Sequence, residues 1–284
     1  MFTKLINRII TAVLLPVLMS PVSPVMSIKK AVWKPTEIIS LADSGYAEES
    51  RELKITAHRG ITAIAPENTL PAYQKAVELG YYSAECDIKL TSDEHWVLSH
   101  YSYIGWHFWQ IGLIKNLDLE TLRTYSYKNG RNFWAYDSLK IPTLEEFLDL
   151  FIGSETRPQV EIKQKRVYDK LGSVVDIIRE KGLEKQAIVI SFDIKDLKKL
   201  RELSPDLELW YMPSRINEKS ISELKDVGGN VWFSCKFANV NAESLKLAEE
   251  NGIGVSLWGI DSVKTASKAY KMGARNIETD NISN

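Results

Sequence analysis

Short runs rich in β-branched residues alternate with amphipathic runs from Leu53 to the end of the chain. Apolar residues recur at helical spacing in the amphipathic runs, which predicts helices over 70–79, 144–151, 170–181, 193–203, 220–227, 242–251 and 262–272. The runs between them predict strands at 54–57, 83–90, 159–163, 187–192, 207–212, 230–235, 254–258 and 276–279. The expected helix N-caps are Asn68, Thr143, Asp193 and Asp261.

This order of elements predicts an α/β fold with a parallel sheet, because parallel strands need helical crossovers between them. Eight strand and helix units within residues 53–284 favour a closed (β/α)8 TIM barrel. An open doubly wound sheet is the alternative. It is disfavoured because no glycine-rich phosphate loop follows the first strand, and because candidate site residues come from several strand ends.

A long segment interrupts the rhythm between the second and third expected strands. It forms an insertion at about 101–140, and its surroundings are rich in rings: Trp96, Tyr101, Tyr103, Trp106, Phe108, Trp109, Tyr125, Tyr127, Phe133, Trp134 and Tyr136. Segments this long in a compact domain are usually lids or small subdomains. We therefore expect a lid beside the barrel.

The N-terminus resembles a secretory signal. Lys4 and Arg8 precede a short apolar run, and small residues follow it, so residues 1–27 are expected to be a signal peptide. An uncleaved membrane anchor is the alternative, and it would keep the protein near a membrane surface. Either reading places the body of the protein outside the cytoplasm, whether secreted, periplasmic or anchored. Residues 28–52 lack periodicity and are expected to be a spacer or cap.

Charge and cysteine content exclude some classes of protein. The 36 Lys and Arg nearly balance the 37 Asp and Glu, giving a net charge of −1, so no nucleic-acid partner is indicated. Cys86 and Cys235 both lie in apolar strand-like runs, which favours buried free thiols over a disulfide. The composition does not indicate an oligomeric state.

The first candidate site residues follow the first expected strand. His58, Arg59 and Gly60 stand in the loop between this strand and its helix, which is where barrel enzymes carry their chemistry. A guanidinium is a planar fork of donors suited to phosphate, and glycine allows close approach of the backbone to a ligand. The alternative is that His58 is a loop residue and Arg59 a surface residue, neither with a functional role.

Acidic residues occur in pairs along two neighbouring strands. Glu85 and Asp87 are two positions apart and therefore point to the same face, and Glu161 and Lys163 repeat this spacing. Carboxylates on the inner face of a barrel strand are costly unless they are paired or bind a metal, and carboxylate oxygens suit hard cations. Solvated charges on an edge strand are the alternative.

The four histidines differ in their setting. His100 ends an extended apolar run, and with His58 it offers a general acid and a general base on either side of a scissile ester. A structural role for His100 is the alternative. His95 and His107 are expected to be surface or lid residues.

Together these motifs resemble the glycerophosphodiester phosphodiesterase family over about residues 55–281. The similar segments are 58–60, 66–69, 85–87, His100, 141–144, 161–163, 190–192 and 279–280. The resemblance implies a TIM barrel and one Ca²⁺ or Mg²⁺ held by Glu85, Asp87 and Glu161. It further implies that His58 and His100 are the acid/base pair, and that Lys163 makes an electrostatic contact to phosphate. Arg59, Glu67, Asn68 and Trp258 are implied on the substrate side.

The sequence departs from the family pattern directly after His100. An Asp and an Arg-Thr pair are usual there, whereas this chain has aromatic residues over 101–109. We hypothesise that these rings change the pocket of the leaving group and favour a sugar, inositol or lipid-like alcohol. The alternative is that they pack a lid against the barrel.

The expected function is metal-dependent hydrolysis of glycerophosphodiesters to an alcohol and glycerol phosphate, outside the cytoplasm. The expected partner is thus a small-molecule phosphodiester or a lysolipid. Two alternatives remain open. One is a lysophospholipase D-like phosphodiesterase acting on lipid substrates, and the other is a catalytically silent barrel used for binding.

Overall fold

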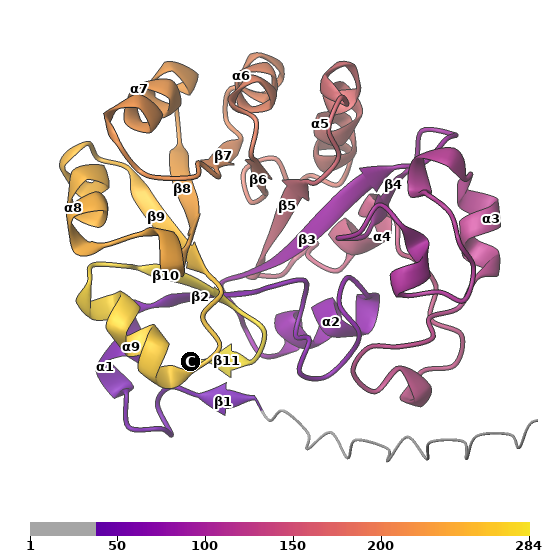
Figure 1. The fold of residues 1–284 in the computed structure, drawn as a ribbon, viewed down its shortest axis with the longest axis horizontal. Helices are drawn as coiled ribbons and strands as arrows, with labels where there is room; N and C mark the ends of the chain where they lie inside the picture. The colour runs from indigo at the N-terminus through magenta and orange to yellow at the C-terminus, as the bar shows by residue number, and fades with distance from the viewer. Residues whose placement is uncertain (1–37) are drawn as a thin grey trace, which may run out of the picture. The chain divides into compact units, whose positions relative to one another are not determined.

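The computed structural model describes residues 38–284, which form a closed parallel barrel (Figure 1). Its strands are β2 (Lys54–Ala57), β3 (Ser83–Leu90), β5 (Arg157–Ile162), β6 (Ile188–Ser191), β7 (Glu208–Tyr211), β8 (Val231–Lys236), β9 (Gly254–Trp258) and β10 (Asn276–Thr279). Neighbours in the sheet follow the order β2-β10-β9-β8-β7-β6-β5-β3, and β2 also pairs with β3, which closes the ring. The predicted barrel is confirmed, and the open doubly wound sheet is excluded.

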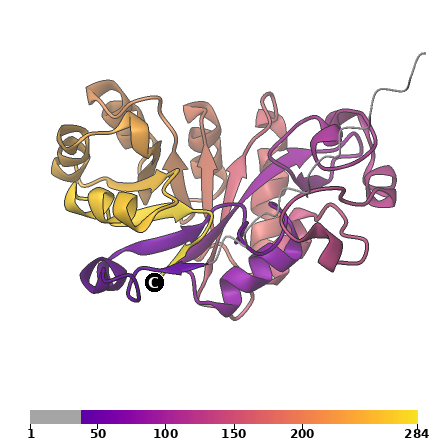
Figure 2. The ribbon, with the colours of Figure 1, turned by 60° about the horizontal axis from the view of Figure 1, so that its bottom comes forward.

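Helices cover the outside of the strands (Figures 1 and 2). They are α2 (Leu70–Glu78), α4 (Leu144–Asp149), α5 (Leu171–Glu180), α6 (Ile194–Leu203), α7 (Glu218–Val227), α8 (Ala242–Glu250) and α9 (Val263–Lys271). Each lies within about two residues of its predicted range, which is the usual scatter of helix ends. Thr143 and Asp193 are N-caps as predicted, whereas Thr69 and Ser262 hold the positions expected for Asn68 and Asp261.

The insertion leaves the barrel through a hairpin. Strand β4 (Trp96–Leu98) runs antiparallel to β3, and the segment beyond it carries the short helix α3 (Leu119–Thr124). A small core of its own holds the insertion together, made of Val97, Ile104, Phe108, Ile114, Leu122, Tyr127 and Ile141. Asn132 anchors it to the loop after β2 by donating to the Ile64 carbonyl at 3.0 Å. Several of the rings therefore pack a lid, while others remain exposed.

Residues 38–52 pack against the C-terminal end of the chain. Strand β1 (Ile39–Ser40) pairs with β11 (Ile282–Ser283), and helix α1 (Ala47–Glu52) contacts α9, where Ser267 donates to Glu49 at 2.8 Å. The predicted signal segment, residues 1–27, lies outside the described residues. Within residues 38–284, no helix is long and apolar enough to cross a membrane.

The interior of the barrel is divided into a polar and an apolar half, because alternate residues of each strand face inward. Residues of β6, of β7 and directly after β7 form an apolar cluster of Ile188, Ile190, Trp210 and Met212. Strands β2, β3, β5, β9 and β10 supply a hydrogen-bonded polar set instead: Thr56, Ser83, Gln159, Ser256 and Asn276. Charged side chains follow the polar set toward the carboxyl ends of β2, β3, β5 and β10, which positions the candidate site.

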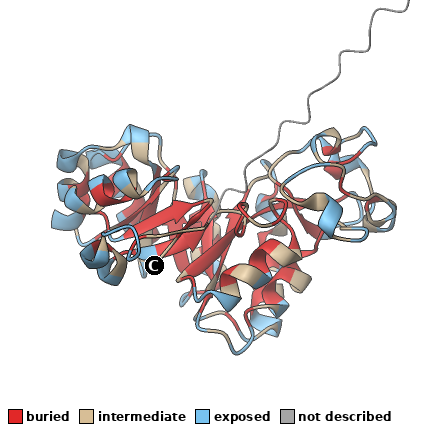
Figure 3. Cartoon of the chain, turned by 90° about the horizontal axis from the view of Figure 1, so that it is seen from below, coloured by how far each residue is buried: buried red, intermediate tan, exposed pale blue. Residues whose placement is uncertain are grey.

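The cysteines lie away from this polar interior. Cys86 and Cys235 are buried and free, as predicted. Figure 3 shows how burial is distributed over residues 38–284: the barrel strands are buried, and exposed residues lie on the outer faces of the helices.

Candidate active site

Three buried carboxylates meet at the mouth of the barrel. Glu85 and Asp87 of β3 and Glu161 of β5 bring ligand oxygens within 4.8 Å of one another. Their side chains point inward because β3 and β5 are parallel and in register, with Asp87 opposite Glu161. These residues are at most 5% exposed. The sequence prediction that these carboxylates converge is confirmed.

One oxygen of this trio has no protein partner. Glu85 Oε2 accepts a hydrogen bond from the Arg59 amide at 2.9 Å, whereas Glu85 Oε1 is buried and makes no hydrogen bond. A buried, unpartnered carboxylate oxygen is costly unless a cation fills the space beside it. The hard oxygen donors of the trio fit Ca²⁺ or Mg²⁺, so the residues present suit the cation that the sequence indicates.

The titration of the trio points the same way. Burial raises the pKa of Glu85 well above its usual range, and repulsion from Asp87 adds to this. Burial and the same neighbour raise the pKa of Glu161 to about 7. Burial also acts on Asp87, but the cations Lys163 and Arg59 outweigh it and lower its pKa. A divalent cation would relieve the repulsion that raises the first two values.

The loop after β2 fixes the position of Asp87. Asn68 is almost fully buried, and its amide donates to Asp87 Oδ2 at 3.0 Å while its carbonyl accepts from the Asp87 amide at 3.1 Å. Asn68 has a left-handed backbone with φ of 54°, an uncommon conformation that these bonds hold in place. Gly60 allows the loop to close, because a Cβ there would lie 2.7 Å from that of Ala72. Asn68 thus orients Asp87 through two hydrogen bonds.

Two cations lie against the carboxylates. Arg59 pairs with Glu67 at 2.9 Å and approaches Asp87 at 3.3 Å. Lys163 Nζ lies 2.6 Å from Glu161 and 3.4 Å from Asp87. Both cations are partly exposed at the mouth, so each can offer N–H groups to an anionic ligand beside the metal position.

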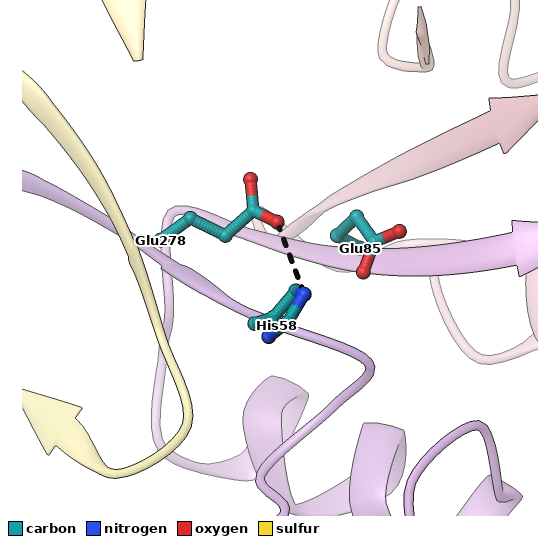
Figure 4. A group of neighbouring side chains, drawn as sticks. All are labelled: His58, Glu85 and Glu278. Carbon is teal, nitrogen blue, oxygen red and sulfur yellow. Dashed lines mark ion pairs between the residues drawn. The ribbon is translucent and has the colours of Figure 1, made fainter. Parts of the chain in front are cut away.

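His58 lies on the Glu85 side of the trio. Its Nδ1 is 2.9 Å from Asp280. Its Nε2 is 3.9 Å from Glu278, and Figure 4 shows this pair beside Glu85. Burial lowers the pKa of the imidazole, but the bond to Asp280 and the charges of Glu278 and Glu85 prevail and raise it to about 10. His58 is therefore held as an imidazolium that donates to Asp280.

His100 lies on the Asp87 side, and its setting is the opposite. Its Nδ1 is buried and has no hydrogen-bond partner, and its ring meets Tyr101 edge-on at 4.7 Å. Burial lowers the pKa of His100 to about 4; Arg59 and Lys163 act in the same direction, against an opposing effect of Asp87. The two rings thus flank the trio, one protonated and the other neutral.

The remaining sequence predictions have mixed outcomes. His95 is exposed, as expected for a surface residue. His107 belongs to the lid as expected, yet it is only 14% exposed and its Nε2 lies 3.2 Å from Glu67. Trp258 is half-buried, packs on the apolar half of the interior, and leaves its indole N–H without a partner.

Three residues lie at the site although the sequence alone does not assign them to it. Glu278 could have been found, because Asn276 and Glu278 put polar groups on the same inner face of the last strand. Asp280 was part of a recognised motif but had no assigned partner. The contact of His107 with Glu67 joins residues 40 positions apart and has no local signal.

Comparisons with known proteins agree with this geometry. Residues 58–284 match the glycerophosphoryl diester phosphodiesterase family. A glycerophosphodiester phosphodiesterase of Caldanaerobacter subterraneus is 26% identical over 241 residues, covering 80% of this chain and 93% of that protein.

Solved structures show the same fold. A phosphodiesterase of Oleispira antarctica in complex with the product sn-glycerol-3-phosphate aligns with a TM-score of 0.74 at 21% identity, over 85% of this chain and 95% of that one. A glycerophosphodiester phosphodiesterase of Parabacteroides distasonis aligns with a TM-score of 0.68 at 24% identity, over 81% and 93% of the two chains. The chain is a TIM-barrel phosphodiesterase that belongs to the glycerophosphoryl diester phosphodiesterase family.

Proposed function

We propose that this phosphodiesterase hydrolyses small glycerophosphodiesters to an alcohol and glycerol phosphate with one Ca²⁺ or Mg²⁺ at Glu85, Asp87 and Glu161. The observation that carries the proposal is the buried carboxylate trio flanked by two imidazoles of opposite protonation. When bound, such a cation neutralises charge on the phosphodiester and orients its oxygens. The product bound to the Oleispira antarctica protein supports the choice of substrate class.

Arg59 and Lys163 bind the phosphate in this proposal. Both already lie beside Asp87, so a phosphate next to the cation would come within reach of both. Their donors stabilise the charge that grows on the phosphate oxygens as the attacking oxygen approaches phosphorus. Glu67 holds the Arg59 guanidinium in place through the contact at 2.9 Å.

The protonation of the two rings suggests their roles. His58 carries a proton and can deliver it to the departing alkoxide. His100 is neutral and can accept a proton from the attacking oxygen. This attacking group is either water or a hydroxyl of the substrate that first closes a cyclic phosphate, and both routes need the same pair of rings.

We expect Asp280→Asn to narrow the pH range of activity from the alkaline side. His58 must be protonated to act as an acid, so activity is lost as pH rises through its pKa, and the Asp280 carboxylate raises that pKa. Without this charge the alkaline limb of kcat/KM should move down by about 1 to 3 pH units. The acid limb, which follows His100, should stay in place.

A cation at the trio lowers the pKa of both rings, so the comparison is between variant and wild type at one metal concentration. An alkaline limb that stays in place in Asp280→Asn would contradict the acid role of His58. Movement of the acid limb would contradict the base role of His100.

The rings after His100 favour a polyol or lipid-like alcohol. Tyr101 contacts His100 and stacks on Trp106 with centroids 5.0 Å apart, so the stack borders the mouth of the barrel on the side of His100. Rates on glycerophosphocholine, glycerophosphoinositol and a lysophospholipid test this. Preference for the lysophospholipid would support the lysophospholipase D-like alternative. Equal rates on the three substrates would show that the stack confers no specificity.

We also propose that the enzyme acts outside the cytoplasm. The support is the sequence of residues 1–27, with Lys4 and Arg8 before an apolar run. N-terminal sequencing of the enzyme tests the cleavage on which this rests: a start near residue 28 supports it, and an intact Met1 contradicts it.

A further inference from the structure

A lysine-lined cavity adjoins the candidate active site. It has a volume of about 440 Å³ and opens between the end of β3, the insertion and the loop after β5. Four of its lining residues are lysines, and none is acidic: Lys89, Ser102, Leu113, Ile114, Lys115, Lys163, Gln164 and Lys165. This lysine pocket therefore attracts anions.

Lys89 is the unusual member of the lysine pocket. It is only 3% exposed, and its ammonium donates to the Lys163 carbonyl at 3.2 Å. Among residues 38–284, no carboxylate lies within ion-pair distance of it; the nearby Asp87 and Glu161 form their ion pairs with Lys163 and Arg59. A buried ammonium without an anionic partner is costly, and a bound anion would compensate for it.

The lysine pocket is continuous with the reaction centre. Lys163 contributes to its wall, while Lys163 Nζ lies 2.6 Å from Glu161 and 3.4 Å from Asp87, two members of the carboxylate trio. Ser102 brings the wall close to His100, which stands two positions earlier in the chain. A group bound in the pocket can thus belong to the same substrate molecule as a phosphodiester bound at the mouth.

We propose that the lysine pocket binds a second phosphate group, carried on the alcohol part of the substrate. The proposal rests on the phosphodiesterase function described above and narrows its substrate class to phosphorylated alcohols. A pocket of this size accommodates a phosphate together with part of a polyol. Several ammonium groups favour a phosphate through charge without requiring one fixed geometry.

The test compares two substrates that differ by one phosphate, glycerophosphoinositol and glycerophosphoinositol 4-phosphate. We expect wild type to show a kcat/KM at least about tenfold higher for the phosphorylated substrate, since hydrogen bonds to charged groups contribute this much. In the double variant Lys115→Ala/Lys165→Ala the ratio should approach one. Its kcat/KM on glycerophosphoinositol should stay within about twofold of wild type, because neither lysine belongs to the catalytic set.

Lys89→Met should lose the preference too, with its melting temperature measured because the site is buried. Lys185→Ala is the matched control, since Lys185 is exposed in the turn before β6 at the other end of the barrel. No preference in wild type, or a preference that survives in the double variant, overturns the lysine pocket while the function stands. Failure to hydrolyse both of these substrates and glycerophosphocholine overturns the function itself.

A second, independent feature is the distribution of exposed apolar side chains. Ten large hydrophobic residues are exposed in residues 38–284: Leu79, Tyr103, Trp106, Trp109, Ile111, Leu113, Trp134, Ile152, Tyr168 and Phe192. Only Leu79 and Ile152 precede a barrel strand and lie at its amino end. The other eight belong to the insertion or follow β5 and β6 at the mouth. Such clustering marks an interaction surface.

The four most exposed of the eight residues at the mouth form what we call the aromatic rim: Trp106, Trp109, Ile111 and Trp134, which are 56–79% exposed. Lys128 contacts the rim: its Nζ lies 5.2 Å from the Trp109 ring centre and donates to the Gly105 carbonyl at 2.7 Å. Segments 101–117 and 125–136, which carry the rim, contain three Lys or Arg residues and no Asp or Glu: Lys115, Lys128 and Arg131.

We infer that the aromatic rim docks on an anionic phospholipid surface. Tryptophan is enriched at membrane interfaces, because its ring is apolar and its N–H is polar. Neighbouring cations add attraction to anionic headgroups, at about 1 kcal/mol each near the surface. The charge of the rim segments thus complements a lipid surface, and the mouth of the barrel would face it.

A site-specific label tests the docking in the full chain. Both native cysteines are buried, so Ile111→Cys gives one accessible thiol for an environment-sensitive fluorophore. We expect its emission to shift to the blue with vesicles of phosphatidylcholine and phosphatidylglycerol, and less with phosphatidylcholine alone. Ile152→Cys is the matched control and should show no shift, even if residues 1–27 hold the chain on the vesicle.

Adding Trp109→Ser and Trp134→Ser to the labelled Ile111→Cys variant should reduce the blue shift of its emission. Hydrolysis of soluble glycerophosphocholine should stay unchanged. An absent shift at position 111, or equal shifts at positions 111 and 152, would overturn the docking surface.

Discussion

Replacing Glu85 by Gln is expected to abolish the response of the enzyme to Ca²⁺ and Mg²⁺ and to lower kcat/KM by at least about 10³-fold. The variant keeps the shape of the side chain and can still accept the Arg59 amide, but it puts an amide group where the unpartnered oxygen now lies. A bound cation supplies several kcal/mol of charge stabilisation, and about 4 kcal/mol corresponds to this loss of rate.

Thermal unfolding separates this effect from misfolding. Wild type should gain about 2.7 kcal/mol at a cation concentration 100 times its dissociation constant, and Glu85→Gln should gain little. Without the cation the variant should be at least as stable as wild type, because it relieves the repulsion between Glu85 and Asp87. Glu208→Gln is the matched control: Glu208 is also buried, but it pairs with Arg157 at the opposite end of the barrel and should leave the cation response intact.

Replacing His100 by Ala is expected to lower kcat by about 10² to 10⁴-fold, the usual contribution of a general base. The ring has no hydrogen bond on its buried nitrogen, so its loss breaks no network of the fold. Affinity for the cation should change little, because His100 is not among the clustered ligand atoms. The measurement is steady-state hydrolysis of glycerophosphocholine together with the melting temperature.

His95→Ala serves as the comparison, since His95 is exposed in the turn between β3 and β4 and should retain wild-type activity. A fully active His100→Ala enzyme would remove the acid/base pairing. An inactive variant with a much lower melting temperature would instead indicate a structural role for the ring.

The sequence was sufficient for the barrel and for the carboxylate trio. Strand residues two positions apart share a face, so the sequence alone predicts that Glu85 with Asp87, and Glu161 with Lys163, lie on the inner face. The register of β3 against β5 then brings the two pairs together. Local periodicity predicts such features well, because each depends on only a few neighbouring residues.

Features that depend on distant segments could not be predicted in this way. His58 meets Asp280 across 222 positions, and His107 meets Glu67 only because the insertion folds back over the loop after β2. Asn68 was expected to cap α2, but Thr69 takes that position and Asn68 turns inward to hold Asp87. Where a side chain could either cap a nearby helix or bond to a distant residue, the tertiary contact determines its position.

The sequence also left the fate of the aromatic insertion open, and the structure shows a division. Phe108 and Tyr127 belong to the small core of the lid, Tyr101 contacts His100, and Trp109 remains exposed. Composition alone could not separate these three settings, because all of them favour large rings.

The most direct measurement is release of glycerol phosphate from glycerophosphocholine by the purified enzyme after treatment with EDTA. We expect hydrolysis to stop in excess EDTA and to return when Ca²⁺ or Mg²⁺ is added back, because the three carboxylates repel one another and the phosphate without a cation. Undiminished hydrolysis in excess EDTA would contradict a metal centre at Glu85, Asp87 and Glu161.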